Sequence, residues 1–213
     1  MRRTFEKELK ELKNDILRMG SLVEDSLNKA LTSLESSDVK LAEEVLANDQ
    51  DIDKLNYDIE EKSTTLTATQ CPVARDLRLI HSILFIAVHL ERAGDLASNL
   101  AKMTFKIKEV HVIKYTSLLE EMGDKASKLI HLSLEAFANN DIKLAKELPK
   151  MDEPIDETFK AFFKEIVKSG GDEMILDALS NIILAARYIE RIADHAVDIG
   201  QRVTYMVTGD FQA

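Results

Sequence analysis

The two halves of this chain carry the same helical pattern. Apolar residues recur at steps of three and four along nearly all of the 213 residues, which is the spacing of the buried face of an α-helix. Three stretches also recur at an offset of 103 positions: Met19-Gly20 as Met122-Gly123, Asp38–Ala42 as Asp141–Ala145, and Ile52-Asp53 as Ile155-Asp156. A fourth match, Leu90–Asp95 with Ile189–Asp194, has an offset of 99. The sequence therefore predicts a duplicated helical unit.

Turn signals divide each half into three predicted helices. The first half gives helices over residues 5–34, 41–66 and 73–106, and the second half gives helices over 115–137, 142–166 and 172–206. Ser36-Ser37-Asp38 is one such turn, and its aspartate can cap the helix that follows. The prediction is an all-α fold of six long helices in an elongated antiparallel bundle, with domains over 1–108 and 109–213.

Several details of this bundle are also predicted. Leu77 and Leu90 should face inward from the third helix. Pro149 and Pro154 should kink or split the fifth helix, because proline lacks the backbone N–H donor. Cys71 is the only cysteine, and we interpret it as a small residue in a helix–helix connection rather than as a reactive thiol.

The net charge of −10 narrows the range of partners. An acidic surface repels the phosphates of nucleic acid and of anionic lipid, and it favours cations. Met1–Glu6 leads into a charged helix rather than an apolar signal core, and the longest apolar run, Ile83–Val88, is too short to span a bilayer. We therefore expect a soluble cytoplasmic protein that binds no nucleic acid and has no membrane span.

Six oxygen-bearing side chains form two matching rows on the third and sixth predicted helices. They are Glu91, Asp95 and Asn99 in one row, and Glu190, Asp194 and Asp198 in the other. Residues four apart drift by only about 40° around a helix, so each row lies on one face. Such oxygens bind hard cations such as Mg²⁺, Ca²⁺, Mn²⁺ or iron. The alternative is a solvated acidic face in which Arg187 and Arg191, each three residues before a carboxylate, form local ion pairs.

Four further carboxylates lie on the second and fifth predicted helices. They are Asp49 and Asp53, with their duplicates Asp152 and Asp156. These side chains either face the two rows and complete a metal site, or they are helix caps. The histidines are not expected to cluster, because no HxxxH or ExxH spacing occurs, although His195 beside Asp194 could support neighbouring ligands. A single cysteine excludes a sulfur-rich zinc site.

Catalytic motifs are missing from the sequence. It has no phosphate-cradling glycine loop, no GxSxG and no HExxH. A carboxylate-bridged di-metal enzyme pairs Glu with Glu-x-x-His across four helices, and no Glu-x-x-His occurs here. The leading hypothesis is a metal-binding regulatory protein rather than an enzyme. A di-metal helical-bundle enzyme and a metal-free helical adaptor are the alternatives.

The sequence resembles the PhoU family over nearly its whole length. Four stretches carry the resemblance: Met19–Glu24, Pro72–Arg78, Leu90–Asp95, and Ala186–Asp198 with the tail Val203–Gly209. The resemblance implies two three-helix bundles related by pseudo-symmetry. It also implies metal clusters at the two Glu-x-x-x-Asp motifs, holding iron, zinc or other divalent ions.

The same resemblance implies a function. Members of the family are expected to act as negative regulators of the phosphate regulon, between the ATPase of a phosphate ABC transporter and a membrane sensor histidine kinase. We accordingly expect a homodimer in the cytoplasm, reaching the inner membrane only through its partners.

Two features of this chain depart from the family pattern. Asn99 stands where the second half has Asp198, and a neutral amide is the weaker ligand, so the first site should bind fewer ions or bind them less tightly. The second half also lacks an equivalent of Arg75-Asp76-Leu77-Arg78. That one-sided segment either contacts a partner or forms an ion pair at the start of its helix, between Asp76 and a neighbouring arginine.

Overall fold

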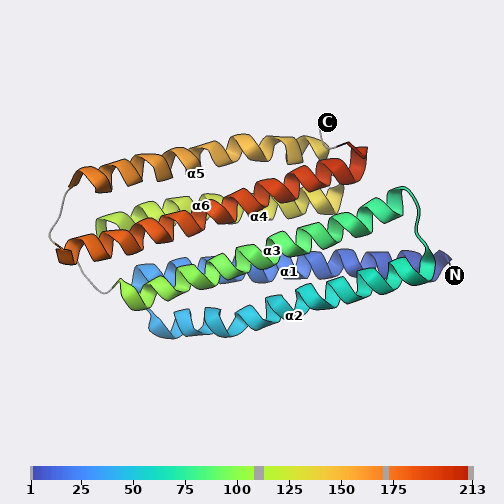
Figure 1. Ribbon diagram of the computed structural model, residues 1–213, viewed down its shortest axis with the longest axis horizontal. Coiled ribbons are helices and arrows are strands. Elements are labelled where there is room, and N and C mark those ends of the chain that lie inside the picture. The colour runs from blue at the N-terminus through green and yellow to red at the C-terminus, as the bar shows by residue number, and fades with distance from the viewer. Residues whose placement is uncertain (1, 108–112, 170–172, 211–213) are drawn as a thin grey trace.

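The computed structural model describes residues 2–107, 113–169 and 173–210 (Figure 1). Within these residues the chain forms helices and no strands: α1 (Arg2–Ser36), α2 (Val39–Gln70), α3 (Arg75–Lys106), α4 (Ile113–Asn139), α5 (Ile142–Ser169) and α6 (Glu173–Thr208). The predicted all-α fold of six long helices is confirmed. Over the same residues, none of the helices combines the length and apolarity needed to cross a membrane.

The helices form two three-helix bundles that lie side by side (Figure 1). Helices α1, α2 and α3 pack against one another, and so do α4, α5 and α6. The bundles meet where α3 packs on α6 and where α1 packs on α4, which leaves α2 and α5 on the outer sides. This is the arrangement that the duplicated sequence predicts. The predicted boundary between residues 108 and 109 falls next to residues outside the described ranges.

An apolar core runs through both bundles at the positions that the periodicity indicates. Met19 in α1 and its duplicate Met122 in α4 are fully buried, and Leu90 in α3 faces inward as predicted. Burial of one such side chain stabilises the fold by about 1.5–3 kcal/mol. The prediction for Leu77 is wrong, because this side chain is 42% exposed. Helix α3 begins at Arg75, so Leu77 lies in its first turn.

The turns after α1 and α4 have the same geometry in both halves. Ser37 (φ 56°) and Asn140 (φ 53°) adopt the left-handed conformation that ends a helix. The aspartate that follows then caps the next helix. Asp38 Oδ1 accepts hydrogen bonds from the backbone N–H groups two and three residues further on, at 3.0 and 3.1 Å, and Asp141 Oδ1 accepts one from three residues further on, at 3.0 Å.

Helices α1 and α4 approach closely at two glycines that the duplication relates. A Cβ added to Gly20 would lie 2.1 Å from Leu134 Cδ1, and one added to Gly123 would lie 2.3 Å from Leu31 Cδ1. The two leucines are themselves related by the offset of 103 positions. Each glycine therefore makes room for the partner half's leucine, and the same contact occurs twice.

Two local predictions have different outcomes. Pro149 and Pro154 do not split α5, which continues through both of them. Both prolines are on exposed positions, so water can reach the carbonyl groups that lose a donor. Cys71 lies where predicted, in the connection after α2, as an exposed C-cap with φ 46° whose N–H donates to Thr67 O at 3.2 Å.

Candidate metal centres

The first carboxylate cluster lies between α2 and α3 and consists of Asp53, Glu91 and Asp95. One oxygen from each of these side chains lies within 4.8 Å of the others. The two residues on α3 are one turn apart, as the row predicts. Close packing brings α2 to them, because Gly94 of α3 faces Ile52, the residue before Asp53, and a Cβ on Gly94 would lie 3.0 Å from Ile52 Cδ1.

Negative charge at this first cluster is only partly compensated. Burial raises the pKa of Glu91, and the charges of Asp95 and Asp53 raise it further, while Arg92 lowers it. Burial likewise raises the pKa of Asp49, and the charges of Asp95 and Asp53 again contribute to the increase. Asp49 therefore belongs to the same electrostatic site, one turn before Asp53 on α2.

Asn99, the third member of the first predicted row, has another partner. Its Oδ1 accepts a hydrogen bond from Lys102 Nζ at 3.0 Å on the same helix. The amide oxygen is thus already used by a cation of the protein. This supports the expectation that the first cluster is the poorer of the two sites.

The second carboxylate cluster lies between α5 and α6 and consists of Asp152, Asp156 and Asp194. Their oxygens also lie within 4.8 Å of one another, and all three side chains are half-buried. In the first cluster, by contrast, Asp53 and Asp95 are exposed. The alternative interpretation of the aspartates on α2 and α5 as helix caps is wrong, because all four lie well inside their helices.

Burial and neighbouring charges also raise the pKa values of the carboxyl groups at the second cluster. Burial raises the pKa of Asp152 to about 6, with further contributions from the charges of Asp194, Asp156 and Glu190. Burial also raises the pKa of Glu190, and the charge of Asp194 adds to it. The pKa of Asp194 is raised mainly by burial as well. Glu190 thus borders the cluster and extends it by one carboxylate.

Two arginines on α6 offset part of this negative charge. Arg187 pairs with Glu190, and Arg191 Nη1 lies 3.2 Å from Asp194 Oδ2. The predicted local ion pairs are therefore present, but they do not satisfy every oxygen. Asp152 Oδ1 and Glu190 Oε2 are buried without a hydrogen-bond partner in the part of the chain that the structure describes.

Buried carboxylate oxygens without donors fit a bound cation. An unsatisfied buried acceptor costs about 1–3 kcal/mol, and more when it is charged. Oxygen-only donor sets suit Mg²⁺, Ca²⁺, Mn²⁺ or iron, and zinc also accepts carboxylate ligands. The residues of both clusters therefore fit the class of ion that the sequence suggests, and the second cluster fits it better.

The structure brings together one group that the sequence analysis missed. His89 on α3 and His195 on α6 are both buried, and their Nδ1 atoms lie 3.1 Å apart. Asp198, the last residue of the second predicted row, has its Oδ2 3.4 Å from His89 Nδ1. The prediction that the histidines do not cluster is wrong. They come from different halves, so only the packing of α3 on α6 joins them.

The segment Arg75–Arg78, which forms the first turn of α3, does not show the ion pair that the sequence analysis considered. Among the described residues, none of the ion pairs joins Asp76 to Arg75 or Arg78. Asp76 lies instead in the first turn of α3, where a negative charge favours the helix. Arg75 is exposed and lines a hollow with Lys13 at one end of the molecule.

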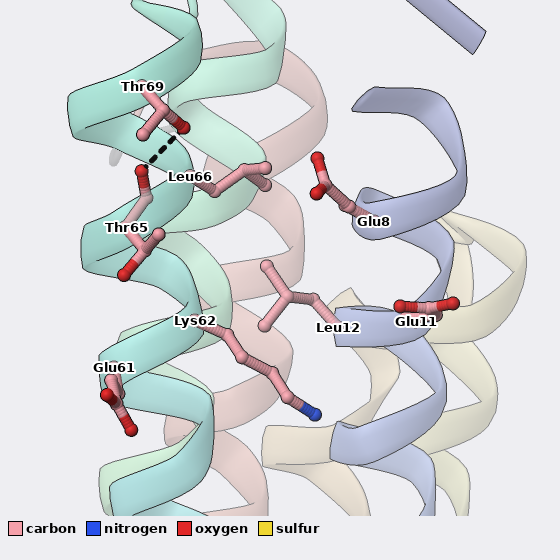
Figure 2. Close-up of a pocket in the computed structure, with 8 residues that line it drawn as sticks. All are labelled: Glu8, Glu11, Leu12, Glu61, Lys62, Thr65, Leu66 and Thr69. Carbon is pink, nitrogen blue, oxygen red and sulfur yellow. Dashed lines mark hydrogen bonds between the residues drawn. The ribbon is translucent and has the colours of Figure 1, made fainter. Parts of the chain in front are cut away.

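Another hollow, of about 310 Å³, lies between the start of α1 and the end of α2 (Figure 2). Figure 2 shows Glu8, Glu11 and Leu12 on the α1 side, with Lys62 reaching across from α2. Lys62 Nζ is already bonded to Asp15 Oδ2 at 2.6 Å. No set of converging metal ligands is found here among the described residues, so this hollow is not a candidate metal site.

Comparison with known proteins agrees with this geometry. The family model of the PhoU domain matches twice, over residues 16–104 and 119–203, which are the two duplicated units. The chain belongs to the PhoU family. A PhoU homolog 1 of Thermotoga maritima, named a phosphate-specific transport system accessory protein, is 38% identical over 96% of this chain and 89% of its own. A homolog from Clostridium acetobutylicum is 33% identical over 98% of this chain and 96% of its own.

Solved PhoU structures have the same fold. The crystal structure of PhoU from Pseudomonas aeruginosa matches with a TM-score of 0.89 at 32% identity, covering 97% of this chain and 100% of that one. A phosphate transport system regulatory protein PhoU from Streptococcus pneumoniae matches with a TM-score of 0.90 at 30% identity, covering 97% and 98%. The relatives from Thermotoga maritima and Clostridium acetobutylicum are named accessory proteins, and the one from Streptococcus pneumoniae is named a regulatory protein. The chain is accordingly not an enzyme, and the di-metal enzyme alternative is abandoned.

Proposed function

We propose that this chain is a metal-binding negative regulator of phosphate uptake and of phosphate-regulon signalling. Membership of the PhoU family supports the phosphate-transport role, since its relatives are named accessory proteins of phosphate transport. The proposal that the protein binds metal rests on the two carboxylate clusters, which lie at matching places in the two bundles. The regulator would act in the cytoplasm, as a homodimer, between the ATPase of a phosphate ABC transporter and a sensor histidine kinase.

Metal ions at the two clusters would serve two purposes. They would offset the burial and the repulsion that raise the pKa of Asp152 and of Glu91, and so hold α2 to α3 and α5 to α6. They would also supply positive charge on a protein whose net charge is −10, which a phosphate group of a ligand or partner needs.

The segment Arg75-Asp76-Leu77-Arg78 is our candidate for a partner contact. Arg75 and Lys13 line one hollow, and the pKa of Lys13 is lowered by burial and by the charge of Arg75. Leu79 of the same helix also lines this hollow. Two cations and an apolar side chain at one end of the bundle suit a partner surface that carries an acidic group next to an apolar one.

A reporter experiment tests the proposed function. The chain is expressed in a bacterium that lacks its own PhoU protein and carries a reporter gene under a phosphate-starvation promoter. We expect wild-type protein to lower reporter expression in phosphate-rich medium. The variant Asp53→Asn/Asp194→Asn, which weakens both clusters, should leave the reporter active at equal protein level.

The control for that variant is Glu60→Gln/Glu157→Gln, which removes two exposed charges from α2 and α5 outside the clusters. This control should repress as the wild type does. Wild-type protein that accumulates but never lowers the reporter would refute the regulatory role. Full repression by Asp53→Asn/Asp194→Asn would instead refute its dependence on metal and favour the metal-free adaptor.

A further inference from the structure

We infer that His89, His195 and Asp198 form a separate metal site of the zinc type, which joins the two halves of the molecule across α3 and α6. His89 comes from the first bundle, and the other two residues come from the second. Their ligand atoms lie within 4.8 Å of one another. The site does not depend on the proposed function, because it uses different residues from the two carboxylate clusters.

The distances between the ligand atoms suit one tetrahedral ion. Ligands bound to zinc at about 2.0–2.1 Å in tetrahedral geometry lie about 3.3 Å from one another. His89 Nδ1 lies 3.1 Å from His195 Nδ1 and 3.4 Å from Asp198 Oδ2. Small movements of these side chains would therefore place all three around a single ion, and water can fill the fourth position because the Asp198 side chain is 43% exposed.

Packing fixes the positions of the two imidazoles. The ring of Phe85 packs against His89 with centroids 4.3 Å apart and fixes its orientation. Both histidines are more than nine-tenths buried, which limits the alternatives open to their nitrogen atoms.

Nearby arginines indicate which ions are expected. The charges of Arg92, Arg191 and Arg202 act on the space around the two histidines. Their positive charge disfavours Mg²⁺ or Ca²⁺, which are held by charge alone. Imidazole nitrogens bind Zn²⁺, Co²⁺, Ni²⁺ or Cu²⁺ through stronger directional bonds. The site should therefore select this second group of ions.

The matching place in the duplicated structure cannot hold such an ion. At the offset of 99 positions, His89 corresponds to Tyr188 and Asp198 corresponds to Asn99, while His195 corresponds to Leu96. Each half of the molecule has one carboxylate cluster, whereas the site at His89, His195 and Asp198 occurs once in the whole molecule. A stoichiometry of one ion per chain therefore distinguishes it from the clusters.

Cobalt absorption tests this inference on the full-length protein. Protein stripped of metal with a chelator is titrated with Co²⁺, which absorbs strongly in the visible range in a tetrahedral site and weakly when surrounded by six oxygens. We expect an intense band that saturates at one ion per chain and disappears when Zn²⁺ is added. His195→Gln should lose most of this band, and Asp198→Asn, which changes a partly exposed side chain, should weaken Co²⁺ binding.

Two controls make the result specific. His131→Gln removes an exposed histidine on α4 and should leave the band unchanged. Asp53→Asn/Asp95→Asn disables the first carboxylate cluster and should also leave it unchanged. Lack of an intense band in wild-type protein, or an undiminished band in both His195→Gln and Asp198→Asn, would overturn the proposal. Circular dichroism checks that each variant folds.

Discussion

At the scale of single residues, Asp152 is a carboxylate whose ionised form destabilises the folded protein. Its side chain is half-buried among Asp156, Asp194 and Glu190, and one of its oxygens has no hydrogen-bond donor among the described residues. Its pKa of about 6 means that the folded protein holds the proton more tightly than the unfolded chain does. In the ionised form this residue therefore destabilises metal-free protein.

Replacing Asp152 by Asn should consequently stabilise the metal-free protein at pH 7.5. The shift from 3.8 to about 6 corresponds to about 3 kcal/mol for a shielded group, and solvent screening reduces this to about 1 kcal/mol. The gain should vanish below pH 3.8, where the carboxyl group is protonated in both states, and should grow as the pH rises to about 6. Urea denaturation at several pH values measures it.

The comparison must be made between variant and wild type at each pH. His89 and His195, with pKa values lowered to about 4, make the folded protein less stable as the pH falls, and they do so equally in both proteins. Glu157→Gln, an exposed change on the same helix, should have little effect. A metal-free Asp152→Asn protein that is less stable than wild type at pH 7.5 would contradict the electrostatic account.

Sequence reasoning could find the carboxylates but not all of their partners. The spacing of four residues places Glu91 with Asp95 and Glu190 with Asp194, whatever the neighbouring helices do. His89 and Asp198 are different, because they lie on different helices and meet only through the packing of α3 on α6. The periodicity indicates which face of a helix is buried, but it does not indicate which helix covers that face.

At the scale of helices, the contact between α1 and α4 depends on a glycine in each of them. Replacing Gly123 by Ala would press a methyl group against Leu31. Overpacking of this kind costs about 1–3 kcal/mol, and the better helix propensity of alanine offsets up to about 1 kcal/mol. We expect a small net loss of stability for Gly123→Ala in denaturant unfolding.

A double-mutant cycle with Leu31→Ala isolates this contact. Leu31→Ala alone should cost about 2–5 kcal/mol, and the methyl group of Gly123→Ala should then occupy part of the space that is left. The double variant should therefore be more stable than the sum of the two single changes by at least about 1 kcal/mol. Simple additivity would show that the two residues do not press on each other.

The sequence was enough to predict the six helices, but not the continuity of α5 or the exposure of Leu77. Long apolar stripes and few glycines or prolines leave little alternative to helices over most of the sequence. The continuity of α5 through Pro149 and Pro154 could not be predicted, because it depends on both prolines facing solvent. The exposure of Leu77 likewise depends on where α3 begins relative to the other helices.

At the scale of the whole molecule, duplication gives two carboxylate clusters in unequal surroundings. The second cluster has three half-buried aspartates and Glu190 beside it, whereas the first has two exposed aspartates and a neutral Asn99 that is bonded to Lys102. We predict that the second cluster binds its ions more tightly. Stepwise removal of metal with a chelator should therefore empty the first cluster before the second.

Variants separate the two steps of that titration. Asp53→Asn should abolish the step at low chelator concentration, and Asp156→Asn should abolish the step at high concentration. The reverse assignment would show that the burial of the carboxylates does not control affinity. The duplicated sequence predicts two centres, and Asn99 in place of an aspartate predicts that the first is the weaker. The burial of the carboxylates and the hydrogen bond from Lys102 add to that difference.

The central claim is that the acidic clusters of this PhoU-family chain bind metal ions. Elemental analysis of protein purified without added metal, for the wild type and for Glu190→Gln/Asp194→Asn, tests it most directly. We predict stoichiometric metal in the wild type, a clear loss of metal in the double variant, which disables the second cluster, and no loss in Glu60→Gln/Glu157→Gln. Little metal in the wild type, even after incubation with iron, zinc or manganese, would contradict the claim and reduce the clusters to solvated acidic faces.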